Sequence, residues 1–214
     1  MTSELWITQI VPNLRERVVL SELNDAVKLH RRVMALFPEE LGPAPRQRAA
    51  VLFRLEETPE GSVVLAQSAL KPDITQLPAD YGTALAKPLT PLLNRLSSGV
   101  NVHYRIIANA TRKLGKNTTA GRPKEVVPLY GAEADQWWAR QAENIGLALH
   151  TVHSSQLSNA TGRHRHGRLT HARTRFDGTA TVTDPAALTH HIQIGIGRAK
   201  AFGCGLLTIA PVRR

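Results

Sequence analysis

One histidine in the first part of the chain, His30, lies in a basic segment whose apolar residues follow helical spacing. Lys28, Arg31 and Arg32 flank it. Neighbouring cations lower the pKa of an imidazole by like-charge repulsion, until a bound phosphate offsets them. Histidine is also the usual side chain for proton transfer near neutral pH. A histidine at one helical position is usually structural or merely exposed; the neighbouring cations add the alternative that His30 transfers protons at a phosphate.

A cluster of four glycines lies near the other end of the chain. They are Gly195, Gly197, Gly203 and Gly205. Glycine permits tight turns and close approach of another group to the backbone. A dinucleotide fingerprint would follow a strand and open a helix, whereas here a predicted helix enters and a strand leaves. The segment is therefore either a glycine-rich turn or a loop whose amides, with Arg198 and Lys200, hold a phosphate backbone.

A strongly basic stretch runs from Gly162 to Arg175. It contains His164, His166 and His171, and five arginines: Arg163, Arg165, Arg168, Arg173 and Arg175. No cysteine or acidic residue lies among the histidines, and arginines disfavour a nearby dication, so we predict no metal site. Arginine fits phosphate groups and guanine edges. The stretch therefore predicts a basic β-hairpin that lies along a nucleic-acid groove.

The basic residues are concentrated in the second half of the chain. Residues 1–98 carry 11 basic and 11 acidic side chains, and residues 99–214 carry 16 and 6, which accounts for the whole net charge of +10. This asymmetry favours a polyanionic partner, because each neutralised phosphate releases condensed counterions. A shorter basic run is either a further phosphate contact or a solvated loop: Arg112, Lys113 and Lys116. The 5% aromatic content argues against a broad base-stacking platform and favours recognition of a duplex by shape.

Several classes of protein are disfavoured by what the sequence lacks. It has no G-x-S-x-G, P-loop or C-x-x-C motif, and the carboxylates of its basic half are scattered. A nuclease built from this chain is expected to need no metal and no other cofactor. The single cysteine, Cys204, excludes a disulfide framework and favours a reducing, cytoplasmic setting. No apolar run approaches the roughly 20 residues of a membrane span, and no signal peptide is evident.

Apolar periodicity indicates a similar order of strands and helices in each half of the chain. In the first half we expect strands at 5–11, 49–55 and 61–68 and helices at 22–37 and about 89–96. In the second half we expect strands at 100–108, 150–157, 169–176, 180–183 and 206–212 and helices at 132–149 and 185–194. The pattern predicts an α+β fold of two tandem ferredoxin-like (RRM-like) βαββαβ domains, residues 1–97 and 98–214.

Taken together, these motifs resemble those of the CRISPR repeat-processing endoribonucleases. That family carries two glycine–hydrophobic–glycine triplets separated by five residues, and all four glycines match. Three further stretches resemble the members that serve the type I-E Cascade complex: Gly203-Cys-Gly205-Leu-Leu with Ala210-Pro211, Leu29-His30 with Leu36-Phe37-Pro38, and Pro59-Glu-Gly61 with Val64-Leu-Ala-Gln67-Ser68. The resemblance covers most of the chain and is thinnest between residues 70 and 140.

The resemblance implies an RNA hairpin bound across two tandem domains and cut at its base. It implies attack by the ribose 2′-oxygen, giving a 2′,3′-cyclic phosphate and a 5′-hydroxyl. It also implies that the protein keeps the mature crRNA and joins the other subunits of Cascade. By motif match His30 takes the place of the family's catalytic histidine. Well-known members carry a tyrosine three residues earlier, where this chain has Val27.

This chemistry assigns expected roles to the basic residues. His30 transfers protons, as acid or base, while Lys200 and Arg31 stabilise the charged phosphorane. The remaining expected RNA contacts are Lys28, Arg32, Arg112, Lys113, Lys116, Arg163, Arg165, Arg168, Arg173, Arg175, Gly195, Gly197, Arg198, Gly203 and Gly205. The central expectation is that His30 and the glycine cluster meet around one phosphodiester. A non-catalytic RNA-hairpin-binding subunit of a ribonucleoprotein remains the competing interpretation.

Overall fold

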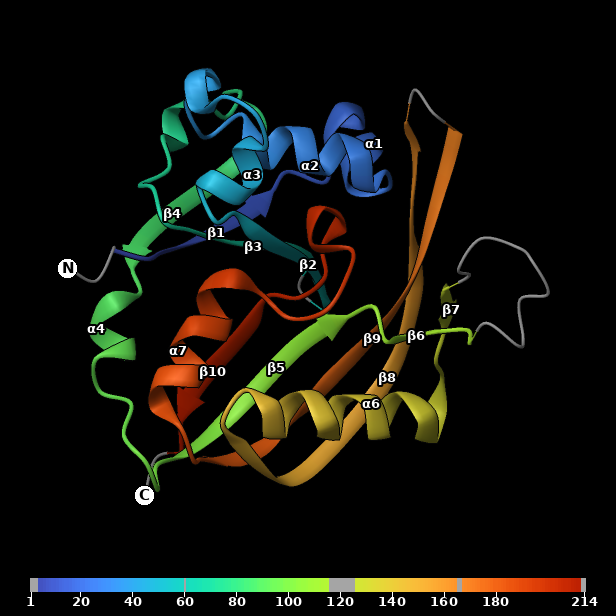
Figure 1. Cartoon of the computed structure of the whole chain (residues 1–214). Helices are drawn as coiled ribbons and strands as arrows, with labels where there is room; N and C mark the ends of the chain where they lie inside the picture. The colour runs from blue at the N-terminus through green and yellow to red at the C-terminus, as the bar shows by residue number, and fades with distance from the viewer. Residues whose placement is uncertain (1–3, 60, 116–125, 165–166, 213–214) are drawn as a thin grey trace.

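The structure is a computed structural model that describes residues 4–59, 61–115, 126–164 and 167–212. The expectations for Lys116, Arg165 and His166 therefore lie outside the described residues. Two four-stranded antiparallel sheets form the body of the molecule (Figure 1). Within the described part of the chain, no helix combines the length and the apolar character needed to cross a membrane.

The first sheet has the strand order β2-β3-β1-β4. Its strands are β1 (Trp6–Pro12), β2 (Leu52–Thr58), β3 (Gly61–Ser68) and β4 (Gly82–Pro88). Between β1 and β2 the chain forms α1 (Arg17–Leu23), α2 (Ala26–Met34), the 3₁₀ turn η1 (Glu39–Leu41) and α3 (Pro45–Arg48). Only a 3₁₀ turn, η2 (Ile74–Gln76), stands between β3 and β4, where the second helix of a ferredoxin-like unit would lie.

The second sheet has the equivalent order β10-β5-β9-β8. Its strands are β5 (Asn101–Ala108), β8 (Leu147–His164), β9 (Gly167–Val182) and β10 (Leu207–Pro211). The other elements are α4 (Thr90–Leu93), the β6–β7 pair (Thr111–Lys113 and Val126–Pro128), α6 (Gly131–Asn144), α7 (Pro185–Ile194) and η3 (Lys200–Phe202). This strand order in both sheets confirms the predicted α+β fold of two tandem ferredoxin-like units.

The predicted elements are largely confirmed, with differences at identifiable residues. The helix expected at 22–37 is wrong in extent, because Asp25 caps a new helix by accepting hydrogen bonds from the amides of Val27 and Lys28. The helix expected to reach residue 149 ends at Asn144, since Gly146 turns the chain at φ 83°. The strands expected at 169–176 and 180–183 form one strand, β9. The strand β4 was not predicted.

The two sheets are joined by buried polar contacts. Arg54 of β2 is 2% exposed. Its guanidinium donates to the carbonyl oxygens of Arg105 in β5 (3.0 Å) and of Leu206, just before β10 (3.2 Å), and it forms an ion pair with Glu56. Gln67 of β3, also buried, donates to the carbonyl of Ile192 at 2.7 Å. These bonds fix the first sheet against α7 and β10, and so fix the elements that carry His30 and the glycine cluster.

Candidate active site

His30 lies on α2, on the side that faces the second sheet. Val27, Leu29 and Val33 of the same helix are buried in or near the first core, whereas His30 is only partly buried. Its ring lies 6.2 Å from the ring of Phe53 and 6.4 Å from that of Phe202, measured between centroids. Its Nδ1 atom is buried and has no hydrogen-bond partner among the described residues. Proton exchange with a bound ligand must therefore use Nε2.

The glycine loop, residues 195–205, brings Phe202 to that histidine. All four glycines have positive φ, between 75° and 86°. An added Cβ at Gly195 would lie 2.7 Å from the Leu52 side chain, and one at Gly205 would lie 2.5 Å from the carbonyl of Ile196. Glycine is required there because any side chain would clash and be strained. Figure 1 shows the loop, in red, reaching from α7 to the region below α2.

The amides of the loop serve mainly to hold its shape. The Gly195 amide donates to the carbonyl of His191 (2.9 Å), and the Gly205 amide donates to that of Ile107 (2.7 Å). Gly195, Gly203 and Gly205 are buried, and of the four glycines Gly197 alone is exposed. This arrangement does not support the expected direct amide contacts to phosphate at Gly195 and Gly205. The structure does place His30 beside the glycine loop, with its ring 6.4 Å from that of Phe202; a shared phosphodiester stays a prediction.

Cations surround the histidine on more than one side. Burial lowers the pKa of His30 below its ordinary value, and the charges of Arg46 and Arg31 lower it further. Burial also lowers the pKa of Lys200, again with a contribution from Arg46. The Lys200 ammonium donates to the carbonyl of Ile194 at 2.9 Å, at the end of α7. A phosphate bound here would neutralise the half-buried charges of Arg46 and Lys200 and the exposed charge of Arg31.

Arg46 has no pattern in the sequence that marks it as a site residue. It belongs to α3, a helix of four residues that is too short to give a periodic pattern. Its Nη1 atom donates to the carbonyl of Val51 at 3.0 Å, which holds the side chain in place. The sequence signal was the pair of arginines just before β2, but nothing in their spacing relates them to His30. Arg46 thus adds a third cation, beside Arg31 and Lys200, to the candidate site.

The other basic residues of α2 have partners within the domain. Arg32 forms a bidentate ion pair with Glu22 (2.8 and 2.9 Å) and lies over the Tyr81 ring at 4.9 Å. Lys28 is exposed, and its ammonium donates to the Ser21 hydroxyl at 2.7 Å. Arg32 therefore stabilises the packing of α2 in this structure, while Lys28 remains accessible.

The predicted basic hairpin is confirmed as the end of β8–β9, where Arg163 pairs with Arg168. Further along β9, Arg173 donates to the carbonyl of Ser158 (2.7 Å) and Arg175 forms an ion pair with Asp177 (2.9 Å). Figure 1 shows the hairpin rising beside α1 and α2. Arg112 and Lys113 are exposed on β6. The roles of these residues in RNA binding remain predictions.

The hairpin packs closely against the start of the histidine helix. A Cβ added at Gly162 would lie 2.8 Å from the Asp25 carboxylate and 2.9 Å from the Val27 side chain. Val27 is 5% exposed. Because Val27 is covered by the hairpin backbone, a tyrosine at this position would not fit without displacing β8. Where well-known members of the family carry a tyrosine, this chain has Val27 packed against Gly162 of the hairpin.

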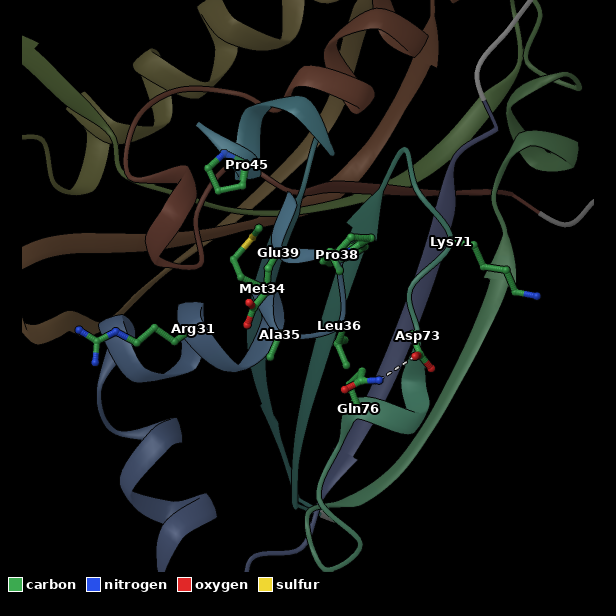
Figure 2. A pocket seen from close by; sticks show the side chains of 11 residues that line it. Arg31, Met34, Ala35, Leu36, Pro38, Glu39, Pro45, Lys71, Asp73 and Gln76 are labelled. Atoms are coloured by element: carbon green, nitrogen blue, oxygen red, sulfur yellow. Dashed lines mark hydrogen bonds between the residues drawn. The ribbon is translucent and has the colours of Figure 1, made fainter. Parts of the chain in front are cut away.

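A pocket of about 770 Å³ opens beside the C-terminal end of α2, and His30, Phe53 and Phe202 are not among its lining residues (Figure 2). Arg31 and Lys71 lie at opposite ends of it and point away from each other. Glu39 and Asp73 also line it, and hydrogen bonds from Thr75 and Gln76 keep the pKa of the Asp73 carboxyl low. The mixed charges fit a phosphate poorly, so we assign the site to His30 and the glycine loop.

The described residues contain no group of three or more histidine, cysteine, aspartate or glutamate side chains that could hold a metal ion.

Replacing Arg46 by glutamine should raise the pKa of His30. Arg46 repels the imidazolium, so removing its charge favours the protonated ring, while burial keeps the pKa below the ordinary value of about 6.5. The measurement is an NMR titration of the His30 ring in the free protein. Arg48→Gln, an exposed change on the same short helix, is the control and should leave the titration unchanged. A His30 pKa that falls or stays constant in Arg46→Gln would contradict this electrostatic assignment.

The chain is a tandem ferredoxin-like protein. A histidine of its first unit faces a glycine-rich loop of the second, and cations lie around that histidine. Sequence comparison identifies the family. The chain belongs to the family described as CRISPR associated protein, whose model matches residues 5–211.

Individual relatives match over nearly their whole length. The CRISPR system Cascade subunit CasE of Escherichia coli is 32% identical over 199 residues, which cover 88% of this chain and 93% of the relative. The CRISPR-associated endoribonuclease Cse3 of Thermus thermophilus is 27% identical over 221 residues, which cover 97% of this chain and 100% of the relative. A solved structure of Thermus thermophilus Cse3, bound to an RNA representing a pre-cleavage complex, has a TM-score of 0.80 at 28% identity and covers 97% of this chain and 100% of its own.

Proposed function

We propose that this protein is an endoribonuclease that binds the repeat hairpin of CRISPR RNA and cleaves pre-crRNA without a metal ion. It then stays bound to the mature crRNA as a subunit of Cascade. The observation that carries the proposal is the contact between His30 and the glycine loop, with the basic hairpin beside both. Residues 1–97 and 98–214 act as its two domains, and the protein works in the cytoplasm.

The relatives support this assignment by what they are named. One is a Cascade subunit, one is an endoribonuclease, and one was captured with an RNA that represents a pre-cleavage complex. This chain covers 93–100% of the length of each of these proteins.

The reaction needs no external nucleophile. The ribose 2′-oxygen forms a bond to the adjacent phosphorus, and the bond from phosphorus to the 5′-oxygen breaks. One proton leaves the 2′-hydroxyl and another reaches the departing oxygen, which leaves a 2′,3′-cyclic phosphate and a 5′-hydroxyl. His30 exchanges protons through Nε2, since Nδ1 is buried. Its lowered pKa leaves the free imidazole neutral at pH 7, in the form that can accept a proton.

Charge on the phosphoryl oxygens is stabilised by the cations around His30. Lys200 and Arg31 contact the phosphate, and Lys200 exchanges its hydrogen bond to the Ile194 carbonyl for the ligand. Arg46 acts beside them by keeping the site positive. Cations that are half buried before the ligand arrives act in a medium of lower dielectric than water, where their effect on developing charge is larger.

The β8–β9 hairpin of the protein binds the phosphate backbone of the RNA duplex. Arg163 and Arg168 lie opposite each other near the hairpin tip, and the packing of Gly162 on α2 ties that surface to the histidine helix. The other residues expected to contact RNA remain predictions: Lys28, Arg112, Lys113, Lys116, Arg165, Arg173, Arg175, Gly197, Arg198 and Gly203. The amides of Gly195 and Gly205 and the guanidinium of Arg32 are not included, because they already have partners within the protein. Binding therefore positions the base of the hairpin at His30.

Cleavage in the presence of a chelator tests the proposal. A labelled repeat-hairpin RNA incubated with excess protein and EDTA should be cut once, giving one product with a cyclic phosphate. The reason is that the 2′-oxygen is the nucleophile and protein cations replace the metal. The matched control is the same RNA with a 2′-deoxy sugar at the cut site, which should remain intact while binding equally well. Cleavage that requires added Mg²⁺, or that proceeds with the deoxy substrate, would contradict the mechanism.

A non-catalytic RNA-binding subunit is the second candidate. Val27 favours it, since the phenol found in well-known relatives is absent here and its place is filled by packing. That candidate predicts tight hairpin binding with no cyclic phosphate under any condition tested.

A further inference from the structure

Phe202 differs from the other phenylalanines of the chain in its exposure. The sequence contains four. Phe37, Phe53 and Phe176 are buried, at 6%, 1% and 0% exposure, and pack in the cores. Phe202 is only partly buried. One partly exposed ring would need no explanation alone, but this ring lies beside His30, where it can contact a ligand with an aromatic face.

A second histidine extends this surface. His171 of β9 stacks on Phe202 with a centroid distance of 5.1 Å and an angle of 20° between the ring planes. It is also partly exposed. His30 contacts the same phenylalanine at its edge, with an angle of 60°. Three segments distant in the sequence, α2, the glycine loop and β9, thus place three rings in succession.

The stacked pair is held firmly. Asn109 forms a backbone bridge with Arg198 of the glycine loop, and its side-chain amide donates to the carbonyl of Ala172 at 2.7 Å. The loop that carries Phe202 is therefore fastened to the strand that carries His171. Burial and the charge of Arg198 lower the pKa of His171, so its ring is neutral at pH 7. A rigid, uncharged pair of rings loses little conformational entropy when a further ring stacks on it.

We propose that His171 and Phe202 form a stacking platform for the unpaired nucleobase next to the scissile phosphate. This inference rests on the proposed function, in which the base of an RNA hairpin is presented to His30. Proteins commonly hold unstacked bases at the ends of RNA helices against aromatic or histidine rings. A base on this platform would place its own phosphate beside the His30 ring, and the exposed Arg198 would lie near the same backbone. The low aromatic content of the chain is no obstacle, since one base needs only two rings.

The test compares hairpin RNAs that lack one nucleobase on either side of the cut site. With wild-type protein, removing the base on one side should slow single-turnover cleavage by about 5- to 150-fold, the range that base–aromatic stacking contributes. The His171→Ala variant should cleave the complete RNA more slowly than wild type by a similar factor. Removing the base should not lower the cleavage rate of this variant any further. His171→Phe, which keeps a ring but cannot transfer protons, should restore most of the rate. His153→Ala, an exposed histidine on β8, is the matched control.

Three results would overturn the platform. One is a wild-type rate that is unaffected by the missing base on either side. Another is a loss in His171→Ala that simply adds to the loss from the missing base, since independent effects add. The third is His171→Phe cleaving as slowly as His171→Ala, which would assign the imidazole to proton transfer instead. The same RNAs are compared in equilibrium binding, so the platform is tested even if no cleavage occurs and the proposed function fails. Melting temperatures show whether each variant is folded.

Discussion

Replacing His30 by alanine should lower the single-turnover cleavage rate by about 10²- to 10⁴-fold, the contribution of a positioned proton-transfer group. Affinity for the hairpin should change little, because the basic hairpin and the exposed cations bind the RNA backbone. The ring is only partly buried at the junction of the two units, so its removal leaves the cores intact. The measurement is the cleavage rate with protein in excess, together with the dissociation constant for a 2′-deoxy hairpin.

The matched control for His30 is His103→Ala, which removes an exposed imidazole from β5. It should cleave at the wild-type rate. If His30→Ala retained full activity while bound normally, another group would have to transfer the protons. If it lost affinity and rate by the same factor, His30 would be a binding residue.

Replacing Arg54 by methionine should have the largest effect on stability. Arg54 is buried, bonds to two backbone carbonyls of the second sheet and pairs with Glu56. Its removal leaves a carboxylate and two carbonyl oxygens without that partner. Breaking a buried pair costs about 3–5 kcal/mol, and because Glu56 keeps a second partner in Arg105 (3.3 Å) we expect the lower end of that range. Urea unfolding with RNA absent measures the free energy.

The control for Arg54 separates loss of charge pairing from loss of packing. The double variant Arg54→Met with Glu56→Leu removes both charges and should regain part of the lost stability, since no unpaired carboxylate remains. Arg95→Met, an exposed change on the surface, should be neutral. A free energy of unfolding that is unchanged in Arg54→Met would mean that the two sheets are held together by other contacts.

Part of the site could be predicted from the sequence, because the types and spacing of its residues are typical of phosphate-binding sites. His30 among cations and four glycines with two basic residues made phosphate chemistry one of two open interpretations, and the family resemblance decided between them. The hairpin was predicted for the same reason, since alternating basic residues around a glycine have few other uses. The tandem ferredoxin-like fold followed from the order of apolar segments, even though η2 replaces a helix in the first unit.

The remainder depends on tertiary placement. Arg46 acts on His30 across a turn and a four-residue helix, and no periodicity relates the two. His171 was grouped with the arginines of its hairpin, yet its ring stacks on Phe202 from a loop thirty residues away in sequence. The glycine loop was expected to offer its amides to phosphate, but Gly195 and Gly205 use theirs within the protein. Helical periodicity across residues 22–37 concealed the cap at Asp25 that separates α1 from α2.

The most direct measurement is a structure of the protein with a hairpin RNA whose scissile nucleotide carries a 2′-deoxy sugar, so that the substrate stays uncut. We expect the phosphate at that nucleotide to lie within hydrogen-bonding distance of His30 Nε2 on one side and the Lys200 ammonium of the glycine loop on the other. An RNA whose cleavable phosphate lies elsewhere, for instance in the pocket beside Lys71 and Asp73 with His30 facing only protein, would contradict the account.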